Sequence, residues 1–208
     1  MDQLSRVLSP ELRRLWRGLR SPWAIQCFLD QIPYSTDPIY RCPRRVLQDQ
    51  RAHCVDGALL AAAALRRLGD RPLVTWIHAV DDDGHMVALL RRGRWWGGIA
   101  KSNVVGLRYR EPVYASLREL MMSYFNDYWN ISGKRTMRGY TRPLDLSGFD
   151  RLRWEGEDAG LPMIIDDVLD RLPVTTVVPR GARLNPIDRR SLEAGLIGSD
   201  AAGLFKPG

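Results

Sequence analysis

The sequence predicts an α+β fold in which an antiparallel sheet packs on one apolar helix that carries a cysteine at its N-terminus. The segment 53–68 is rich in Ala and Leu, contains no proline and ends in two arginines before Gly69, which is the usual end signal of a helix. Three short apolar segments follow, 72–80, 85–90 and 94–99, separated by turn-forming residues. Together they predict a helix followed by a three-stranded antiparallel meander.

Two helices are expected before this core. Ser9, Pro10 and Glu11 form a helix start, because they supply an N-cap, a proline in the first turn and an acidic residue beside it. A second helix is expected from Pro22 to about Leu29. The segment 34–49 contains two prolines and is expected to be an irregular connection.

After the meander, a helix is expected from Pro112 to about Trp129. The C-terminal part is expected to hold a short helix at 161–172, a strand at 175–178 and a last helix capped by Asn185-Pro186 that runs to about 194. The chain contains no evident linker. We therefore expect one folded unit, with a main domain at 1–140 and an extension at 141–208 packed on the same domain.

The composition of the 208 residues is that of an ordinary globular protein, 45% hydrophobic and 26% charged. The net charge of +7 comes mostly from arginines in scattered pairs, so nucleic-acid binding is not expected. No apolar run approaches the length needed to span a membrane, and no leader segment is evident, so a cytoplasmic protein is expected. Cys27, Cys42 and Cys54 show no zinc-binding spacing, and neither a metal nor another cofactor is expected.

Cys54 is the first candidate for chemistry. At a helix N-terminus, free backbone N–H groups and the helix dipole favour an anion, which predicts a lowered thiol pKa and a place to hold an oxyanion. The alternative is a small packed cysteine, because free cysteine is commonly buried.

His85 follows a turn at the first position of a strand, where its side chain could reach the helix end. It is the candidate base, with a loosely paired surface histidine as its alternative.

The other histidines are poorer candidates for the base. His53 adjoins Cys54 and points about 100° away from it on a helix, and His78 lies in a strand among apolar residues. A third group usually fixes the imidazole of such a pair. Asn103 is the candidate for this role through its amide oxygen, with Ser102 or a carboxylate from elsewhere in the chain as alternatives.

These segments resemble the transglutaminase-like superfamily of papain-like cysteine enzymes. The resemblance covers about residues 20–105, and Cys54 and His85 match the cysteine and histidine of that family. The aspartate of the family has no counterpart, because Ala100 to Asn103 occupy its place. The motifs that carry the resemblance are Phe28-Leu-Asp-Gln-Ile-Pro-Tyr34, Arg51-Ala-His-Cys54-Val-Asp-Gly-Ala, Leu65-Arg-Arg-Leu-Gly69, Gly84-His85-Met-Val-Ala and Gly93-Arg-Trp-Trp-Gly.

The resemblance implies acyl transfer at a peptide or protein amide, by hydrolysis, deamidation or transamidation through a Cys54 thioester. Because the aspartate is missing, an alternative hypothesis is a non-catalytic module that binds a peptide or a protein partner. In either case Trp95 or Trp96, which alternate in a strand, could line the groove. Asp166 and Asp167 could cover it as a lid, or belong to a segment that is simply scaffold.

Overall fold

The computed structural model describes residues 3–206 and begins with a set of short helices. These are α1 (Gln3–Val7), α2 (Pro10–Gly18), α3 (Pro22–Gln31), α4 (Pro43–Asp49) and α5 (Cys54–Arg67). Ser9 caps α2 and Ser21 caps α3, each by accepting a backbone N–H of the first turn. The expectation of an irregular connection through residue 49 was wrong. Pro43 occupies the first turn of α4, where a missing N–H costs nothing, so it begins a helix rather than breaking one.

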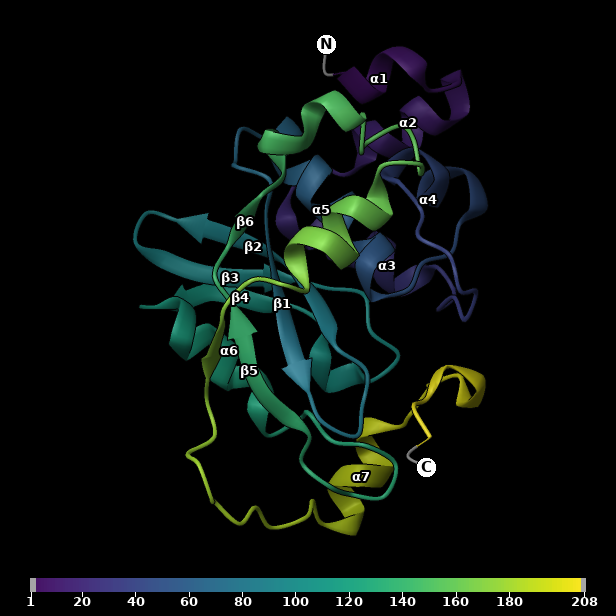
Figure 1. Cartoon of the computed structure of the whole chain (residues 1–208). Coiled ribbons are helices and arrows are strands. Elements are labelled where there is room, and N and C mark those ends of the chain that lie inside the picture. The colour runs from purple at the N-terminus through teal and green to yellow at the C-terminus, as the bar shows by residue number, and fades with distance from the viewer. Residues whose placement is uncertain (1–2, 207–208) are drawn as a thin grey trace.

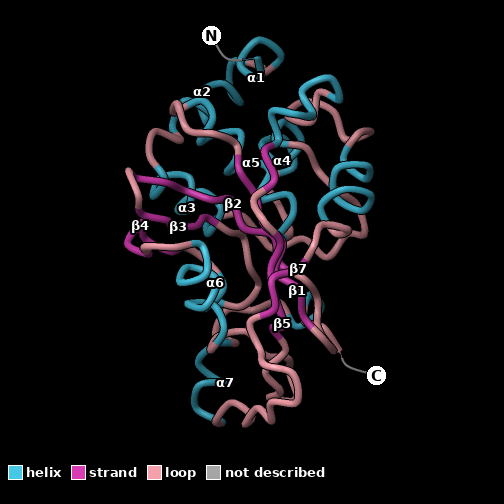
Figure 2. The backbone as a smooth tube through the Cα atoms, turned by 60° about the vertical axis from the view of Figure 1, so that its left-hand side comes forward, coloured by secondary structure: helices cyan, strands magenta, loops and turns pink. Residues whose placement is uncertain are grey.

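One antiparallel sheet runs through the centre of the molecule (Figures 1 and 2). Its strands lie in the order β4-β3-β2-β1-β5-β7, and β6 also pairs with β1. The strands are β1 (Leu73–Ala79), β2 (His85–Arg92), β3 (Trp95–Ile99), β4 (Arg110–Tyr114), β5 (Met137–Thr141), β6 (Leu144–Asp145) and β7 (Val174–Thr176). The mixed helix and antiparallel-sheet architecture confirms the expected α+β class and the β1–β2–β3 meander.

Strand β2 is buried on both faces, and its side chains alternate between two cores. Met86, Ala88 and Leu90 face the core built around α5. Val87 and Leu89 face a second core with the buried side chains of α6 (Leu117–Phe125). The alanines of α5 let this helix approach the sheet closely, as expected from its sequence.

The helix expected from Pro112 begins later than predicted. Pro112 lies in β4, and α6 starts at Leu117 after the N-cap Ser116. Because β4 is an edge strand, a residue without an N–H can be accommodated there. Proline was therefore a poor guide to the start of this helix.

The C-terminal third contributes to both the sheet and the α5 core. It contains the 3-10 helix η2 (Leu146–Leu152), the π-helical turn η3 (Met163–Leu169), α7 (Arg189–Gly195) and the 3-10 turn η4 (Ala201–Gly203). Trp154, Leu161 and Ile164 are buried against α5 and its neighbours. Asp188 caps α7, so the expected start at Asn185-Pro186 was three residues early. Within residues 3–206, no helix is both long and apolar enough to cross a membrane.

Candidate functional site

Cys54 is the first residue of α5, and its neighbour His53 caps the helix. The Nδ1 atom of His53 accepts the Val55 N–H at 3.1 Å, while Asp56 accepts the His53 N–H at 3.2 Å. The Nε2 atom of His53 lies 2.9 Å from the Ile39 carbonyl. Both ring nitrogens are thus used in holding the helix end, which leaves His53 as a structural neighbour of the thiol.

The sulfur of Cys54 lies against the start of β2, with Sγ 3.9 Å from the Gly84 carbonyl oxygen. The backbone N–H groups of Met86 and Val55 favour the thiolate, but burial dominates and raises the thiol pKa to about 11, with Asp56 and Asp83 adding to the rise. The lowered pKa expected from the helix N-terminus is therefore not found. In this conformation Cys54 is a neutral thiol.

His85 is buried, and its Nε2 atom lies 2.9 Å from the Leu107 carbonyl oxygen. A carbonyl only accepts hydrogen bonds, so Nε2 carries a proton. Burial lowers the pKa of His85 to about 4, which keeps the ring neutral near pH 7. Nδ1 is therefore the basic nitrogen of this side chain.

Cys54 and His85 line one small cavity of about 70 Å³. They enter it from different sides of the sheet. Cys54 belongs to α5, whereas His85 alternates with Val87 and Leu89 on the α6 side of β2. Their hydrogen bonds lead to different partners, Gly84 for the thiol and Leu107 for the imidazole. The structure brings the two predicted residues to one cleft without pairing them directly.

Asn103 also lines this cavity, but its amide is used elsewhere. Its Nδ2 donates to the Asp200 carbonyl at 2.8 Å, and its Oδ1 accepts the Asp200 N–H at 2.7 Å. The expected role of Asn103 in orienting His85 is therefore wrong for this conformation. Ser102 does not fill it either, because His85 Nε2 is bonded to the Leu107 carbonyl, and the Ser102 hydroxyl accepts the Val104 N–H. The backbone carbonyl of Leu107 takes the place of the third group.

Trp95 and Trp96 lie at the far end of the β2–β3 hairpin. They pair with Arg92 and Arg91, and an arginine guanidinium covers each indole ring. Arg92 lies seven residues along β2 from His85, which corresponds to roughly 20 Å of strand. The structure therefore does not bring either tryptophan to the Cys54 cleft, and their expected part in its lining is not supported.

The segment 100–103 is held between α3 and α5 by side chains that the sequence analysis did not single out. Gln26 exchanges two hydrogen bonds with the backbone of Ala100, at 3.0 and 3.2 Å. The buried Lys101 ammonium donates to the carbonyls of Leu29 and Ile32, and burial lowers its pKa to about 8. These contacts fix the position from which Asn103 enters the cleft.

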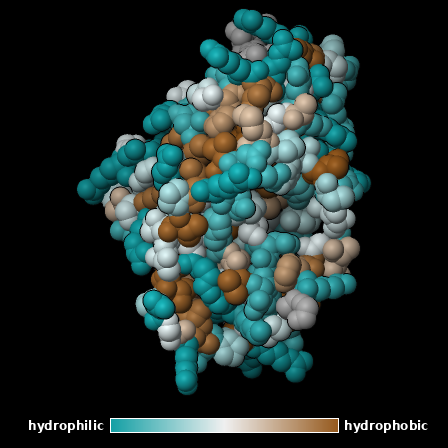
Figure 3. All heavy atoms as spheres, viewed as in Figure 1, coloured by the Kyte–Doolittle hydropathy of each residue, from teal (hydrophilic) through white to brown (hydrophobic). Residues whose placement is uncertain are grey.

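Tyr34 is a further residue of the cleft that the sequence did not identify as functional. Burial raises its pKa above the usual range, and the neighbouring Cys54 and Asp83 raise it further. Its ring lines both the small cavity and a more open one of about 450 Å³ on the other side of Cys54. In Figure 3 the open cavity is seen as a hollow on the right, between the upper body of the molecule and its C-terminal part.

The acidic pair Asp166 and Asp167 does not close this cleft. The Tyr40 hydroxyl donates to Asp166 at 2.6 Å, which places Asp166 beside His53 at the rim. Asp167 pairs with Arg171 at the surface. The segment that does line both cavities around Cys54 is the C-terminal one, through Gly203 and Leu204.

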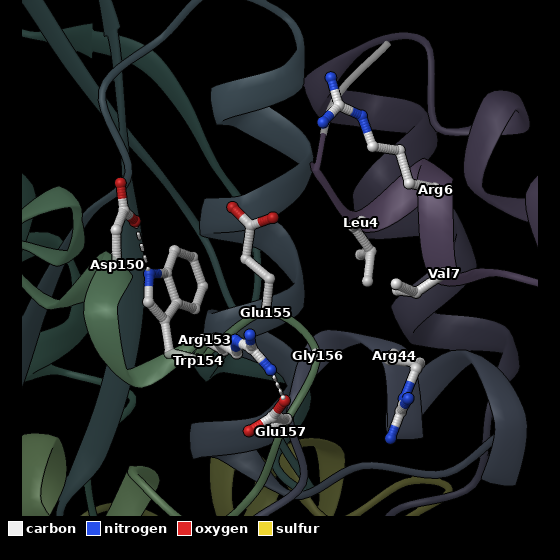
Figure 4. Close-up of a pocket in the computed structure, with 10 residues that line it drawn as sticks. All are labelled: Leu4, Arg6, Val7, Arg44, Asp150, Arg153, Trp154, Glu155, Gly156 and Glu157. Atoms are coloured by element: carbon white, nitrogen blue, oxygen red, sulfur yellow. Dashed lines mark hydrogen bonds and ion pairs between the residues drawn. The ribbon is translucent and has the colours of Figure 1, made fainter.

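Another cavity, of about 280 Å³, lies away from this site between α1, α4 and the segment 150–157 (Figure 4). Figure 4 shows the apolar side chains of Leu4 and Val7 on one side of it and paired charges on the other. Arg153 bonds Glu157 at 2.9 Å, and the Trp154 indole donates to Asp150. It contains neither a thiol nor an imidazole. Within residues 3–206, no three His, Cys, Asp or Glu side chains are grouped so as to hold a metal ion.

Comparison with known proteins finds no matching family model and no matching curated protein. Among solved structures, LapG of Legionella pneumophila is similar in its EGTA-treated form, in its calcium-bound form and in a third structure. Identity is 17–18%, the match covers 48% of this chain and 67–68% of LapG, and the TM-score is 0.35. So partial a likeness assigns no activity, and the transglutaminase-like resemblance remains an inference from the sequence motifs.

Proposed function

We propose that this protein transfers acyl groups from an amide of a peptide or protein through a thioester on Cys54, with His85 as the base. One observation carries the proposal: a thiol at a helix N-terminus shares a cavity with a neutral imidazole whose protonated nitrogen is fixed by a backbone carbonyl. This leaves the basic Nδ1 of His85 to take a proton. The Val55 and Met86 N–H groups beside the sulfur are suited to stabilise negative charge.

The reaction needs one proton carrier and one nucleophile. The thiol proton of Cys54 passes to His85 Nδ1 as the sulfur bonds to the amide carbonyl carbon. The C–N bond then breaks, and the imidazolium returns the proton to the departing amine, which leaves a thioester. Water or another amine attacks this thioester, His85 takes and returns a proton again, and the thiol is restored. The outcome is hydrolysis or deamidation with water, and transamidation with an amine.

The conformation described here is a resting one. A thiol pKa of about 11 and an imidazole pKa of about 4 both oppose proton transfer from sulfur to nitrogen. Burial is the main cause of both shifts, so admitting water to the cleft moves the two values toward each other. Activity therefore requires that the cleft open around Cys54.

The proposal is tested with a small activated ester, p-nitrophenyl acetate, followed by peptide amides. The wild-type protein is expected to carry an acetyl group on Cys54, and Cys54→Ala is expected to lose the protein-dependent turnover. His85→Gln retains a donor for the Leu107 carbonyl but lacks the base, so its turnover should fall by about 100-fold or more. Acetylation of Cys27 as fast as Cys54, or wild-type turnover by His85→Gln, would contradict the proposal.

A non-catalytic peptide-binding module is the second candidate, and one observation favours it. Burial raises the pKa of Cys54 and lowers the pKa of His85, which favours an unreactive thiol beside a neutral imidazole. In that case Cys54→Ala retains full affinity for its peptide partner, and no acyl group is trapped on Cys54 by any amide. Trapping of a Cys54 thioester from an amide substrate would exclude this candidate.

A further inference from the structure

The amide of Asn103 makes two hydrogen bonds to the backbone of a single residue, Asp200. One runs from Nδ2 to the carbonyl and the other from the backbone N–H to Oδ1, at 2.8 and 2.7 Å. A neighbouring β-strand pairs with a residue in the same way, by exchanging one donor and one acceptor. The Asn103 amide thus binds the backbone of another segment, and neither hydrogen bond involves the side chain of that segment.

The residues after Asp200 continue into the space around Cys54. Gly203, Leu204 and Phe205 line the small cavity together with Cys54 and His85. Gly203 passes through a narrow gap, because a Cβ atom at this position would lie 3.0 Å from Asn103 Nδ2 and 3.0 Å from Cδ1 of Tyr34. The φ of Gly203 does not lie in the left-handed region, so close packing, and not the chain conformation, favours a small residue here.

This part of the chain is held loosely. No residue from 189 to 206 is buried, and Ala201 and Ala202 are exposed. In Figure 1 the yellow segment beyond α7 rises from the bottom of the molecule along its right-hand side. Its attachment at the cleft rests on the two hydrogen bonds of Asn103 and on the half-buried Gly203, Leu204 and Phe205 in the small cavity, and none of its own residues belongs to either hydrophobic core.

We propose that the cleft is a receptor for an extended polypeptide, that Asn103 is its backbone-binding residue, and that Asp200–Leu204 occupies it as an internal ligand. The gap between Tyr34 and Asn103 favours glycine at one position of the bound peptide, because a larger residue there would have to displace one of these two side chains. This inference deepens the proposed function, on which it rests, by defining where a peptide substrate lies relative to Cys54. Release of the segment is then the opening step that exposes the thiol.

The first test releases the segment in the full-length protein and reads the exposure of Cys54. Gly203→Val introduces a branched side chain that crowds Asn103 and Tyr34, and Ala194→Val, at an exposed position of α7, is the matched control. Alkylation by iodoacetamide is followed by mass spectrometry, with Cys27 as the internal reference. Labelling of Cys54 is expected to be about tenfold faster in Gly203→Val and unchanged in Ala194→Val. Equal labelling of Cys54 in both variants and in the wild type would overturn the proposal.

The second test adds the C-terminal segment to the Gly203→Val variant as a separate synthetic peptide. A synthetic peptide with the sequence of residues 199–206, blocked at both ends, is added to Gly203→Val and should restore slow labelling of Cys54. The same peptide with valine at the Gly203 position should not protect. Adding Asn103→Ala to Gly203→Val should weaken protection by about tenfold, because two hydrogen bonds are lost. Protection that is indifferent to Asn103, or to the glycine, would show that the cleft does not bind peptide as proposed.

These tests require only binding and alkylation, so they are independent of acyl transfer. Glycine-dependent protection together with failure of Cys54 to turn over p-nitrophenyl acetate would retain the peptide receptor and remove the enzymatic function. Turnover by Cys54 without glycine-dependent protection would do the reverse. Thermal unfolding of each variant shows that the fold is intact before either result is interpreted.

Discussion

Helix α5 and the segment 200–204 meet at the same cleft, but they are held there in opposite ways. Eleven successive residues of α5, from Val55 to Leu65, are buried, and most are alanine or leucine. The segment 200–204 contains no buried residue and is held by the amide of Asn103, the close fit of Gly203 and the half-buried Leu204. Cys54 therefore lies at the start of the most deeply buried helix, whereas the segment beside it contains no buried residue.

The free energies that hold α5 and the segment 200–204 in place differ in the same way. Truncating one buried leucine to alanine costs about 2–5 kcal/mol, because a cavity is added to the lost burial. Two hydrogen bonds between a side chain and the backbone contribute about 1–3 kcal/mol together. The segment can therefore leave the cleft at a cost far below that of unfolding α5.

The largest effect is expected from truncating the chain, which shows where the part needed for folding ends. A chain that ends after Tyr140 loses Leu146, Trp154 and Leu161 from the α5 core and should not fold, since losing several large buried side chains exceeds the 5–15 kcal/mol of a typical domain. A chain that ends after Ser199 loses no buried residue and should keep its cooperative transition. Near-ultraviolet circular dichroism and thermal unfolding measure both. A folded, soluble 1–140 fragment would show that the core is smaller than described.

The next effect concerns His85, which is buried. Its pKa of about 4 lies below the ordinary value near 6.5, so the unfolded chain binds a proton before the folded one does. Stability is retained above pH 6.5 and falls as pH decreases toward 4, by about 2 to 3 kcal/mol at pH 4.5.

Urea unfolding at pH 7.5 and 4.5 isolates this contribution as the difference between the wild type and His85→Gln. Asp82, whose pKa burial raises to about 6, acts in the opposite direction and is common to both proteins. Identical pH dependence in the two proteins would mean that His85 is not buried as a neutral group.

A smaller effect tests the close approach of α5 to the segment that carries Asn103. A Cβ atom on Gly57 would lie 2.3 Å from Cβ of Lys101, so Gly57→Ala should cost about 2 kcal/mol despite the better helix propensity of alanine. Gly18→Ala at the end of α2 is the control, because its Cβ meets no atom within 4 Å. Differential scanning calorimetry compares the two. A stabilised Gly57→Ala would show that α5 and Lys101 are not in contact.

The smallest effect is expected at Trp95. Because this residue lies at the far end of β3, Trp95→Ala should change the iodoacetamide labelling rate of Cys54 by less than about twofold. A labelling change as large as that of Gly203→Val would place Trp95 in the cleft after all, as the sequence alone had suggested.

The elements that could be predicted from the sequence are those with local signals. Ser9 and Ser21 cap helices as serines before proline usually do, and Gly84 precedes a strand as expected. The starts of α4 and α6 were missed because proline is ambiguous by itself. Pro43 opens a helix and Pro112 lies in an edge strand, and only the surrounding structure separates the two cases.

The site was predictable in part for the same reason. Cys54 and His85 were found from their positions at a helix start and a strand start, and they share a cleft. The group that orients His85 is a backbone carbonyl, which any residue at position 107 supplies, so no side chain marks it. The partner of Asn103 lies 97 residues away in the sequence, and it is bound through its backbone, so no side chain of that segment marks the contact. The thiol pKa depends on that packing and was therefore predicted in the wrong direction.

The two edge strands of the sheet, β4 and β7, determine whether another polypeptide can bind by adding a strand. Strand β4 contains Pro112, which has no backbone N–H to offer, directly after the charged Arg110 and Glu111, and β7 at the opposite edge has only three residues. Edges of this kind resist extension by a further strand, which protects a protein against aggregation through its sheet. For the same reason a peptide cannot readily bind by adding a strand to the sheet edge, which is a common way for β-proteins to bind peptides. A chain that approaches this molecule must find its backbone partners elsewhere, and an asparagine amide at the end of β3 is a substitute that does not expose the sheet itself.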